Sequence, residues 1–373
     1  MIWTRPVLGA ARQPRRTSAT FRLSGLLLLG ACALPGSQAS PDASAPVFYP
    51  APPLEPRIQL LATYVGERDV TGGPSAFERF VLGEREHAEL GKPYGLALHD
   101  GQLLICDTRP SIVVVFDLAH RAVELLGEEA TGRLRKPINI AVDPEGYRWV
   151  ADTGHRRLMI YDPQGRYVRA LGDPERWVPT DVVFFEDRAY VVDVENGRVV
   201  VLDRETGEEL DRIGRKGSGR GELFFPTNIA LDAEGNLYVA DTGNARVLKF
   251  SRDGEPLQEF GGLGRGLGQL VRPKGVAVDR EGRVYVADAA FENVQIFAPD
   301  GRLLLFFGTT GNVPGGLNLP ADLLIDYENI DLFADRVADG YTLEYLIVVS
   351  SQFGRNKVNV YGFLSRGESG NEP

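Results

Sequence analysis

Oxygen-bearing side chains recur at one fixed place in this sequence, two residues after a repeated proline. These positions hold Asn139, Asp181, Asn228 and Asp322, and glycine occupies the other two copies. Carboxylate and amide oxygens are the ligands that Ca²⁺ takes in proteins, although it usually takes about six to eight of them. If the fold brings the four side chains together, they form a candidate cation site, with His155 as the base of a metal-assisted reaction.

A second set of acids ends the apolar runs that follow these positions. The set is Asp107, Asp152, Asp193, Asp241 and Asp288, and an arginine follows five residues later in three copies, as Arg157, Arg198 and Arg246. A catalytic acid among these five would need a role that the equivalent aspartates of the other repeats lack. A periodic Asp with a periodic Arg instead favours an ion pair or loop cap that every repeat uses, so we predict a structural role.

Basic residues gather in loops that have no phosphate-binding signature. The glycine-rich stretches 214–221 and 261–268 match neither G-x-x-x-x-G-K-[ST] nor G-x-G-x-x-G. The loop residues that we predict to form a docking patch for an acidic protein partner are Arg109, Arg156, Arg215, Lys216 and Arg220.

A repeat positions all of these residues. Prolines 93, 137, 179, 226, 273 and 320 each start a copy, and successive copies lie 42 to 47 residues apart. Each copy reads as four short strands separated by Asp and Gly turns, and its second strand is continuously apolar. Because both faces of such a sheet need a neighbour, six copies predict an all-β fold, a six-bladed β-propeller whose innermost strands line a central channel.

The ring is predicted to close with a strand from the N-terminal side. Residues 57–66 resemble a fourth strand but precede every complete copy, whereas the sixth copy ends after its third strand. We therefore expect the N-terminal strand to complete the last blade, which gives a propeller over residues 57–364. An insertion at 327–345 has helical spacing and predicts a short surface helix.

The repeat sequence resembles a known family. The segment from Pro226 to Arg246, with Tyr-Val-Ala-Asp-Thr-Gly-Asn near its end, is similar to the NHL repeat. Residues 359–363 resemble the ending of NHL lipoproteins that accompany multihaem cytochromes in bacterial genomes. Lactonases and peptide amide lyases share the fold and use residues at the channel mouth, so the resemblance also implies an alternative, a metal-assisted hydrolase or lyase.

The N-terminus reads as an export signal followed by an anchor. Residues 1–31 hold five arginines and a short apolar run, and Leu29-Gly30-Ala31-Cys32 resembles a bacterial lipobox. We expect lipidation of Cys32, a Pro/Ala/Ser-rich tether over 32–56 and a flexible tail over 365–373. Ala33, which follows the cysteine, suggests the outer membrane, facing the periplasm or the cell surface.

Charge and composition limit the function. The chain has 373 residues, 43% of them apolar, and its net charge of −10 becomes −15 once the five N-terminal arginines are removed. Such an acidic surface repels phosphate backbones and disfavours a nucleic-acid partner. We predict a binding or scaffold module at the cell envelope rather than an enzyme, with no cofactor beyond the candidate Ca²⁺.

Overall fold

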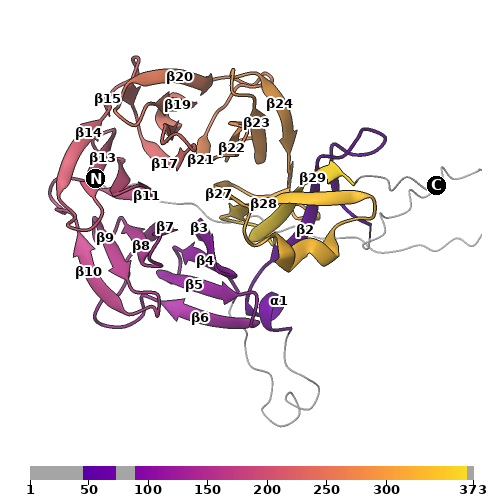
Figure 1. Cartoon of the computed structure of the whole chain (residues 1–373), viewed down its shortest axis with the longest axis horizontal. Coiled ribbons are helices and arrows are strands. Elements are labelled where there is room, and N and C mark those ends of the chain that lie inside the picture. The colour runs from indigo at the N-terminus through magenta and orange to yellow at the C-terminus, as the bar shows by residue number, and fades with distance from the viewer. Residues whose placement is uncertain (1–44, 73–88, 368–373) are drawn as a thin grey trace, which may run out of the picture. The chain divides into compact units, whose positions relative to one another are not determined.

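Six antiparallel sheets surround a central axis in the computed structural model, which describes residues 45–72 and 89–367 (Figure 1). This confirms the predicted all-β, six-bladed propeller. The first blade comprises β3 (Pro93–His99), β4 (Gln102–Asp107), β5 (Ile112–Asp117) and β6 (Ala122–Leu126). The second comprises β7 (Pro137–Val142), β8 (Arg148–Asp152), β9 (Arg157–Tyr161) and β10 (Tyr167–Leu171).

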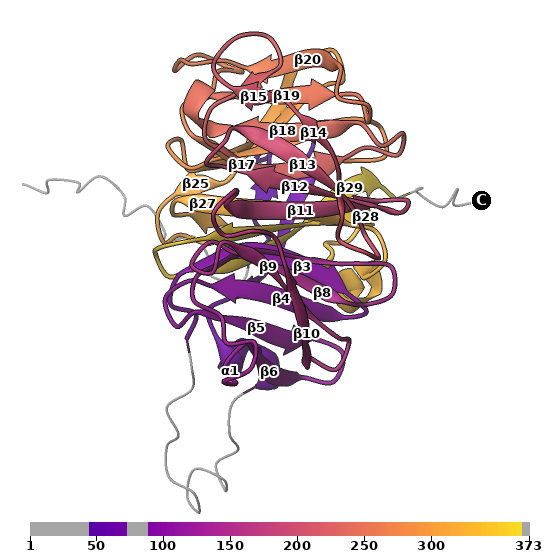
Figure 2. The same cartoon turned by 90° about the vertical axis from the view of Figure 1, so that its left-hand side faces the viewer.

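The next three blades follow the same order, with the innermost strand first. The third comprises β11 (Pro179–Phe185), β12 (Arg188–Asp193), β13 (Arg198–Asp203) and β14 (Glu209–Ile213). The fourth comprises β17 (Pro226–Leu231), β18 (Leu237–Asp241), β19 (Arg246–Phe250) and β20 (Pro256–Gly261). The fifth comprises β21 (Pro273–Val278), β22 (Val284–Asp288), β23 (Asn293–Phe297) and β24 (Leu303–Phe307). Figure 2 shows the first two blades below the third and the fourth blade above it.

The sixth blade combines both ends of the propeller. Its strands are β27 (Pro320–Asp326), β28 (Tyr341–Ser351), β29 (Val358–Arg366), β2 (Ile58–Tyr64) and β1 (Phe48–Tyr49). The predicted N-terminal strand is β2, which pairs antiparallel with β29 from Ile58 opposite Phe363 to Tyr64 opposite Val358. The propeller starts before the predicted boundary at residue 57, because β1 pairs with β2, and β29 continues past residue 364.

The insertion in the sixth blade is shorter and more buried than expected. Its helix is a single 3₁₀ segment, η2 (Ile330–Arg336), and β28 already begins at Tyr341. Phe333 is buried in the core between the sixth and first blades, because its ring packs among apolar residues of both. The sequence reasoning did not predict the short helix α1 (Glu67–Thr71), whose Val70 joins the same core.

Crossovers between blades add short parallel bridges on one side of the ring. They are β15 (Arg215–Lys216) with β16 (Glu222–Leu223) and β25 (Thr309–Thr310) with β26 (Gly316–Leu317), and a 3₁₀ turn, η1 (Thr242–Asn244), lies on the same side. We call this side the crossover face. It consists of the crossovers that lead into each inner strand and of the loops between the second and third strands of each blade. The opposite side carries the turns between first and second strands.

Candidate interaction face

Buried aspartates hold the crossover face in place. The carboxylate that ends each second strand accepts hydrogen bonds from backbone N–H groups of the crossover before the same blade's inner strand. The donors are Gly91 and Lys92 to Asp107, Arg135 and Lys136 to Asp152, Val178 to Asp193, Phe224 to Asp241, and Val271 and Arg272 to Asp288. All five aspartates are 0 or 1% exposed. In the sixth blade Ser351 takes this place and accepts from the Asn318 N–H. These carboxylates therefore cap loops.

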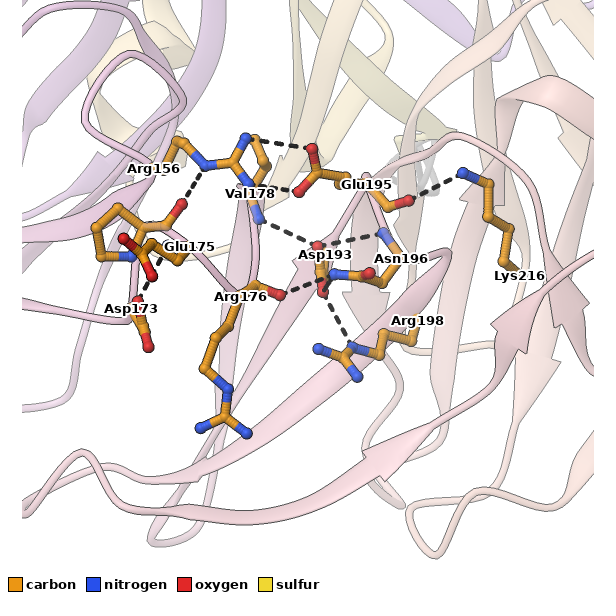
Figure 3. Close-up of polar contacts among 11 residues, drawn as sticks. Arg156, Asp173, Glu175, Arg176, Val178, Asp193, Glu195, Asn196, Arg198 and Lys216 are labelled. Carbon is orange, nitrogen blue, oxygen red and sulfur yellow. Dashed lines mark hydrogen bonds and ion pairs between the residues drawn. The ribbon is translucent and has the colours of Figure 1, made fainter.

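The periodic arginines do not behave alike. Arg198 Nε lies 3.0 Å from the Asp193 carboxylate, as Figure 3 shows, and Arg246 Nε lies 2.9 Å from that of Asp241. Arg157 is exposed and has no ion pair within the described residues, so the expected Asp–Arg contact is absent in the second blade. Asp152 instead accepts from the N–H groups of Gly154 and His155.

Three of the predicted docking residues lie close together around the third and fourth blades. Arg156 and Lys216 approach Glu195 from two sides: Arg156 pairs with its carboxylate, and Lys216 Nζ donates to its backbone carbonyl at 3.1 Å (Figure 3). Arg215 pairs with Glu222 at 2.9 Å. The pair with Arg156 lowers the pKa of Glu195, and the Gly219 N–H together with Arg215 lowers the pKa of Glu222. The two acids therefore stay ionised and hold the arginines in place.

The other two predicted docking residues lie further round the face. Arg220 donates to the Pro256 carbonyl at 3.2 Å and stays exposed. Arg109 is separated from the cluster and lines a cavity of about 610 Å³ between the first and sixth blades, together with Glu89, Arg355 and Lys357. The five residues thus share one face but not one patch.

Large apolar side chains are exposed on the same face. They occupy crossovers and loops of the fourth to sixth blades: Phe224, Phe225, Leu263, Leu267, Val313 and Phe353. Leu263 and Leu267 are 75% and 84% exposed and flank Arg265 in a glycine-rich crossover. The arginines of these loops were predicted as docking residues from the sequence, whereas the apolar residues in the same stretches were not.

The candidate channel residues do converge, but they bond to one another and to the strands. Asn228 Nδ2 donates to Asp322 Oδ1 at 2.9 Å, and the N–H of Leu96 donates to Asp322 Oδ2 at 3.0 Å. The backbone N–H groups of Ile229 and Val182 donate to the Asp181 carboxylate, and the N–H of Ile140 donates to Asn139 Oδ1. The four side chains are 1 to 6% exposed, and Asn139, Asp181 and Asp322 line a channel cavity of about 310 Å³.

Glycine in the two remaining inner strands is a steric requirement of this cluster. A Cβ atom at Gly95 would lie 2.0 Å from Asn139 Oδ1, and one at Gly275 would lie 2.7 Å from the Asp322 Cα. The axis therefore has room for four side chains and not for six. The repeat pattern of Asn, Asp and Gly follows from this packing limit.

Burial makes the two acids of the channel hard to ionise. Desolvation raises the pKa of Asp322 to about 7 and raises that of Asp181 well above its usual value, and the neighbouring Asp322 carboxylate adds to the effect on Asp181. Asn228 Oδ1 is buried and has no hydrogen-bond partner among the described residues. A rotation of this amide would place the oxygen against Asp322 Oδ1, where it can accept the proton of the neutral acid.

The cluster does not match the ligand set of a calcium site. Three of its four groups already direct their oxygens at N–H donors, which leaves Asn228 Oδ1 as the free acceptor. Within the described residues no group of three or more His, Cys, Asp or Glu side chains is placed to hold a metal. His155 lies elsewhere than expected: its Nε2 contacts the Arg133 carbonyl at 2.8 Å, and it does not line the channel.

Calcium is therefore expected to leave the stability of the purified chain unchanged. We predict the same melting temperature in EDTA and in excess CaCl₂, measured by differential scanning fluorimetry. If the channel held a calcium site, free Ca²⁺ at 100 times the Kd of that site would stabilise the fold by about 2.7 kcal/mol. A calcium-dependent rise of several degrees that is lost in Asn228→Ala would contradict this account of the channel.

The channel acids also give the fold a pH dependence with a defined sign. Because the folded pKa of Asp322 lies above the value of 3.8 in the unfolded chain, its contribution is fully present below about pH 4 and is lost as the pH rises through about 7. We expect the unfolding free energy in urea to fall between pH 5 and pH 8, and to fall less in Asp322→Asn. The exposed Asp300→Asn is the control, and equal slopes in all three proteins would contradict the assignment.

Membrane attachment is not visible in the described part of the chain. Among residues 45–72 and 89–367, no helix is long and apolar enough to cross a membrane. Cys32, the signal over 1–31 and most of the predicted tether lie outside the described residues, as does the tail from residue 368.

Comparison with known proteins agrees with this architecture. Residues 178–261 match a family model described as a 6-bladed beta-propeller, and residues 270–298 match the NHL repeat. NHL repeat-containing protein 3 of Homo sapiens is 25% identical over 122 residues, and its Mus musculus counterpart is 28% identical over 122 residues. Each match covers 28% of this chain and 35% of the relative, so the chain spans about a third of these relatives.

Solved structures of similar shape include enzymes. A gluconolactonase from Xanthomonas campestris superposes with a TM-score of 0.54 at 17% identity, over 83% of this chain and 90% of that one. A catalytically inactive virginiamycin B lyase from Staphylococcus aureus with quinupristin gives 0.51 at 12% identity, over 73% and 94%. At such identities the likeness shows the fold alone. With the six sheets and the family match taken together, the chain is a six-bladed β-propeller, and its residues 270–298 are similar to the NHL repeat.

Proposed function

We propose that this propeller is a lipid-anchored binding module of the cell envelope, and that its crossover face docks a protein partner. The observation that carries the proposal is the gathering of exposed apolar side chains, such as Phe225, Leu263 and Leu267, among arginines on one face. Exposed apolar patches rimmed by polar groups are typical of protein interfaces, in which arginine and aromatic residues are enriched.

The buried aspartate caps support this role because they fix the loops before binding. A partner that meets prearranged loops loses less conformational entropy on association. Lipidation of Cys32 would keep the module at a membrane surface, where an envelope partner is found at high local concentration. The resemblance at residues 359–363 makes multihaem cytochromes the first partners to test. The channel provides no specific observation that favours the metal-assisted hydrolase or lyase.

A capture experiment with matched variants tests the proposal. We expect the tagged full chain to recover the same envelope protein repeatedly from detergent-solubilised membranes, and Leu267→Asp with Arg220→Glu to recover at least about tenfold less, which corresponds to about 1.4 kcal/mol. The control, Leu304→Asp with Arg302→Glu, changes the same residue types at exposed positions of the fifth blade, with Leu304 on its outer strand and Arg302 on the turn before that strand. Equal recovery by both double variants would contradict docking through the crossover face.

The anchor is tested by fractionation of the same cells. Cys32→Ser should move the chain from the membrane fraction to the soluble fraction, because a single cysteine carries the proposed acyl chains. If Cys32→Ser stays in the membrane fraction, the anchor assignment is wrong, whatever the capture experiment gives.

A further inference from the structure

A buried lysine lies at the mouth of the channel without an acidic partner. Lys274 follows the repeat proline of the fifth blade and is 7% exposed. Its Nζ donates to the Tyr94 hydroxyl at 2.9 Å and lies 4.5 Å from the centroid of the Tyr94 ring. Within the described residues it has no ion pair with any carboxylate. A buried cation without a counter-charge costs several kcal/mol, so its presence calls for a reason.

The groups around Lys274 increase this cost instead of relieving it. Burial, together with the neighbouring charges of Arg272 and Lys92, lowers the pKa of Lys274 to about 8. Burial raises the pKa values of Asp181 and Asp322, so these two acids ionise less readily than ordinary aspartates. The charges that act on Lys274 are those of Arg272 and Lys92, and no carboxylate of the described residues forms an ion pair with it.

More cations continue from this mouth toward the first and sixth blades. Lys92 Nζ lies 5.2 Å from the Phe353 ring, and the adjacent Gly91 lines the cavity of about 610 Å³. Arg109, Arg355 and Lys357 line the same cavity, where Glu89 is the one acid. Burial lowers the pKa of Lys357, while the nearby Asp107 carboxylate opposes this effect and the Arg109 charge adds to it. This concentration of cations contrasts with the net charge of −10 of the chain.

We propose that this cationic site, formed by Lys92, Arg109, Arg272, Lys274, Arg355 and Lys357, binds an acidic peptide segment of the partner protein, with one carboxylate held by Lys274. The inference rests on the proposed docking function and names the chemistry of the partner. The Lys274 ammonium has N–H donors beyond the one given to Tyr94, and the Tyr94 hydroxyl, which accepts from Lys274, has its own proton free to donate. Several cations spread from the cavity to the channel mouth suit a run of Asp and Glu side chains better than a single small acid.

Binding of a defined probe tests the site without knowledge of the partner. We expect the full chain to bind fluorescein-labelled hexaglutamate in an anisotropy titration at low salt, and not to bind labelled hexaglutamine. Lys274→Met keeps the length of the side chain and removes its charge, and it should weaken hexaglutamate binding at least about tenfold. Its melting temperature should equal or exceed that of the unchanged chain, because the unpaired buried charge is gone. Arg302→Met, on an exposed turn of the opposite face, should bind as the unchanged chain does.

The inference would be overturned by a lack of hexaglutamate binding to the unchanged chain, or by equal binding to Lys274→Met. The inference would also be overturned if inorganic polyphosphate bound as tightly as hexaglutamate and its binding did not change in Lys274→Met. Such a result would indicate non-specific electrostatic attraction instead of a defined site. These failures are distinguishable from failure of the docking proposal. Envelope capture that depends on Leu267 and Arg220 but not on Lys274 would retain docking and reject the acidic segment. Hexaglutamate binding that depends on Lys274, without any envelope capture, would retain the anion-binding site and reject the docking proposal.

Discussion

Removal of β2 is expected to unfold the whole propeller. A chain that starts at residue 67 loses Ile58, Leu61 and Tyr64, which are 0, 8 and 5% exposed, and leaves the edge of β29 unpaired. Burial of each such side chain contributes about 1.5–3 kcal/mol, so the loss approaches the total stability of a typical domain, about 5–15 kcal/mol. We expect no cooperative melting transition by near-ultraviolet circular dichroism and strong aggregation.

The control for this deletion is a chain that starts at residue 46 and retains both β1 and β2. It should melt as cooperatively as the full chain. A chain starting at residue 67 that melts within a few degrees of this control would show that the N-terminal strand does not hold the sixth blade in place.

Loss of Arg246 is expected to be the most damaging single change on the crossover face. Arg246 is 8% exposed and bonds to Asp241, to Glu259 and to the carbonyls of Gly219 and Glu222. Arg246→Met leaves the Asp241 carboxylate, itself 0% exposed, without its cation. Breaking a buried pair in this way costs about 3–5 kcal/mol, and we expect that loss in the unfolding free energy measured in urea.

The equivalent arginine of the second blade provides a matched control. Arg157 occupies the same repeat position but is exposed and has no ion pair among the described residues. Arg157→Met should therefore change the unfolding free energy by less than about 0.5 kcal/mol. Equal effects of the two substitutions would mean that the repeat position, and not the buried contacts of Arg246, decides stability.

The repeat made most of the fold predictable. The spacing of the prolines and the apolar second strands identified six blades, and the unpaired third strand of the last copy indicated where residues 57–66 belong. The strand β1 was missed because Phe48 and Tyr49 stand within a Pro/Ala/Ser-rich stretch whose composition resembles a linker. Its place depends on long-range contacts of Tyr49 with Phe307 and Tyr361, which no local pattern reveals.

The candidate site was predictable only in part, for a similar reason. Counting oxygen ligands at the channel could not show that backbone N–H groups already occupy them, because those bonds depend on the packing of neighbouring inner strands. Lys274 did carry a sequence signal. It stands in the copy Pro273-Lys274-Gly275, where the other copies have tyrosine, isoleucine, threonine or alanine after the proline. Attention to that departure from the repeat would have found it.

Site-specific photo-crosslinking in cells that produce the full chain tests the docking claim most directly. A photoreactive residue at Phe225 or Leu267 on the crossover face should yield one crosslinked partner of constant size. The same residue at Leu304, on the outer edge of the fifth blade, should yield none. A partner that crosslinks at Leu304 and not at Phe225 or Leu267 would contradict the assignment of the binding face.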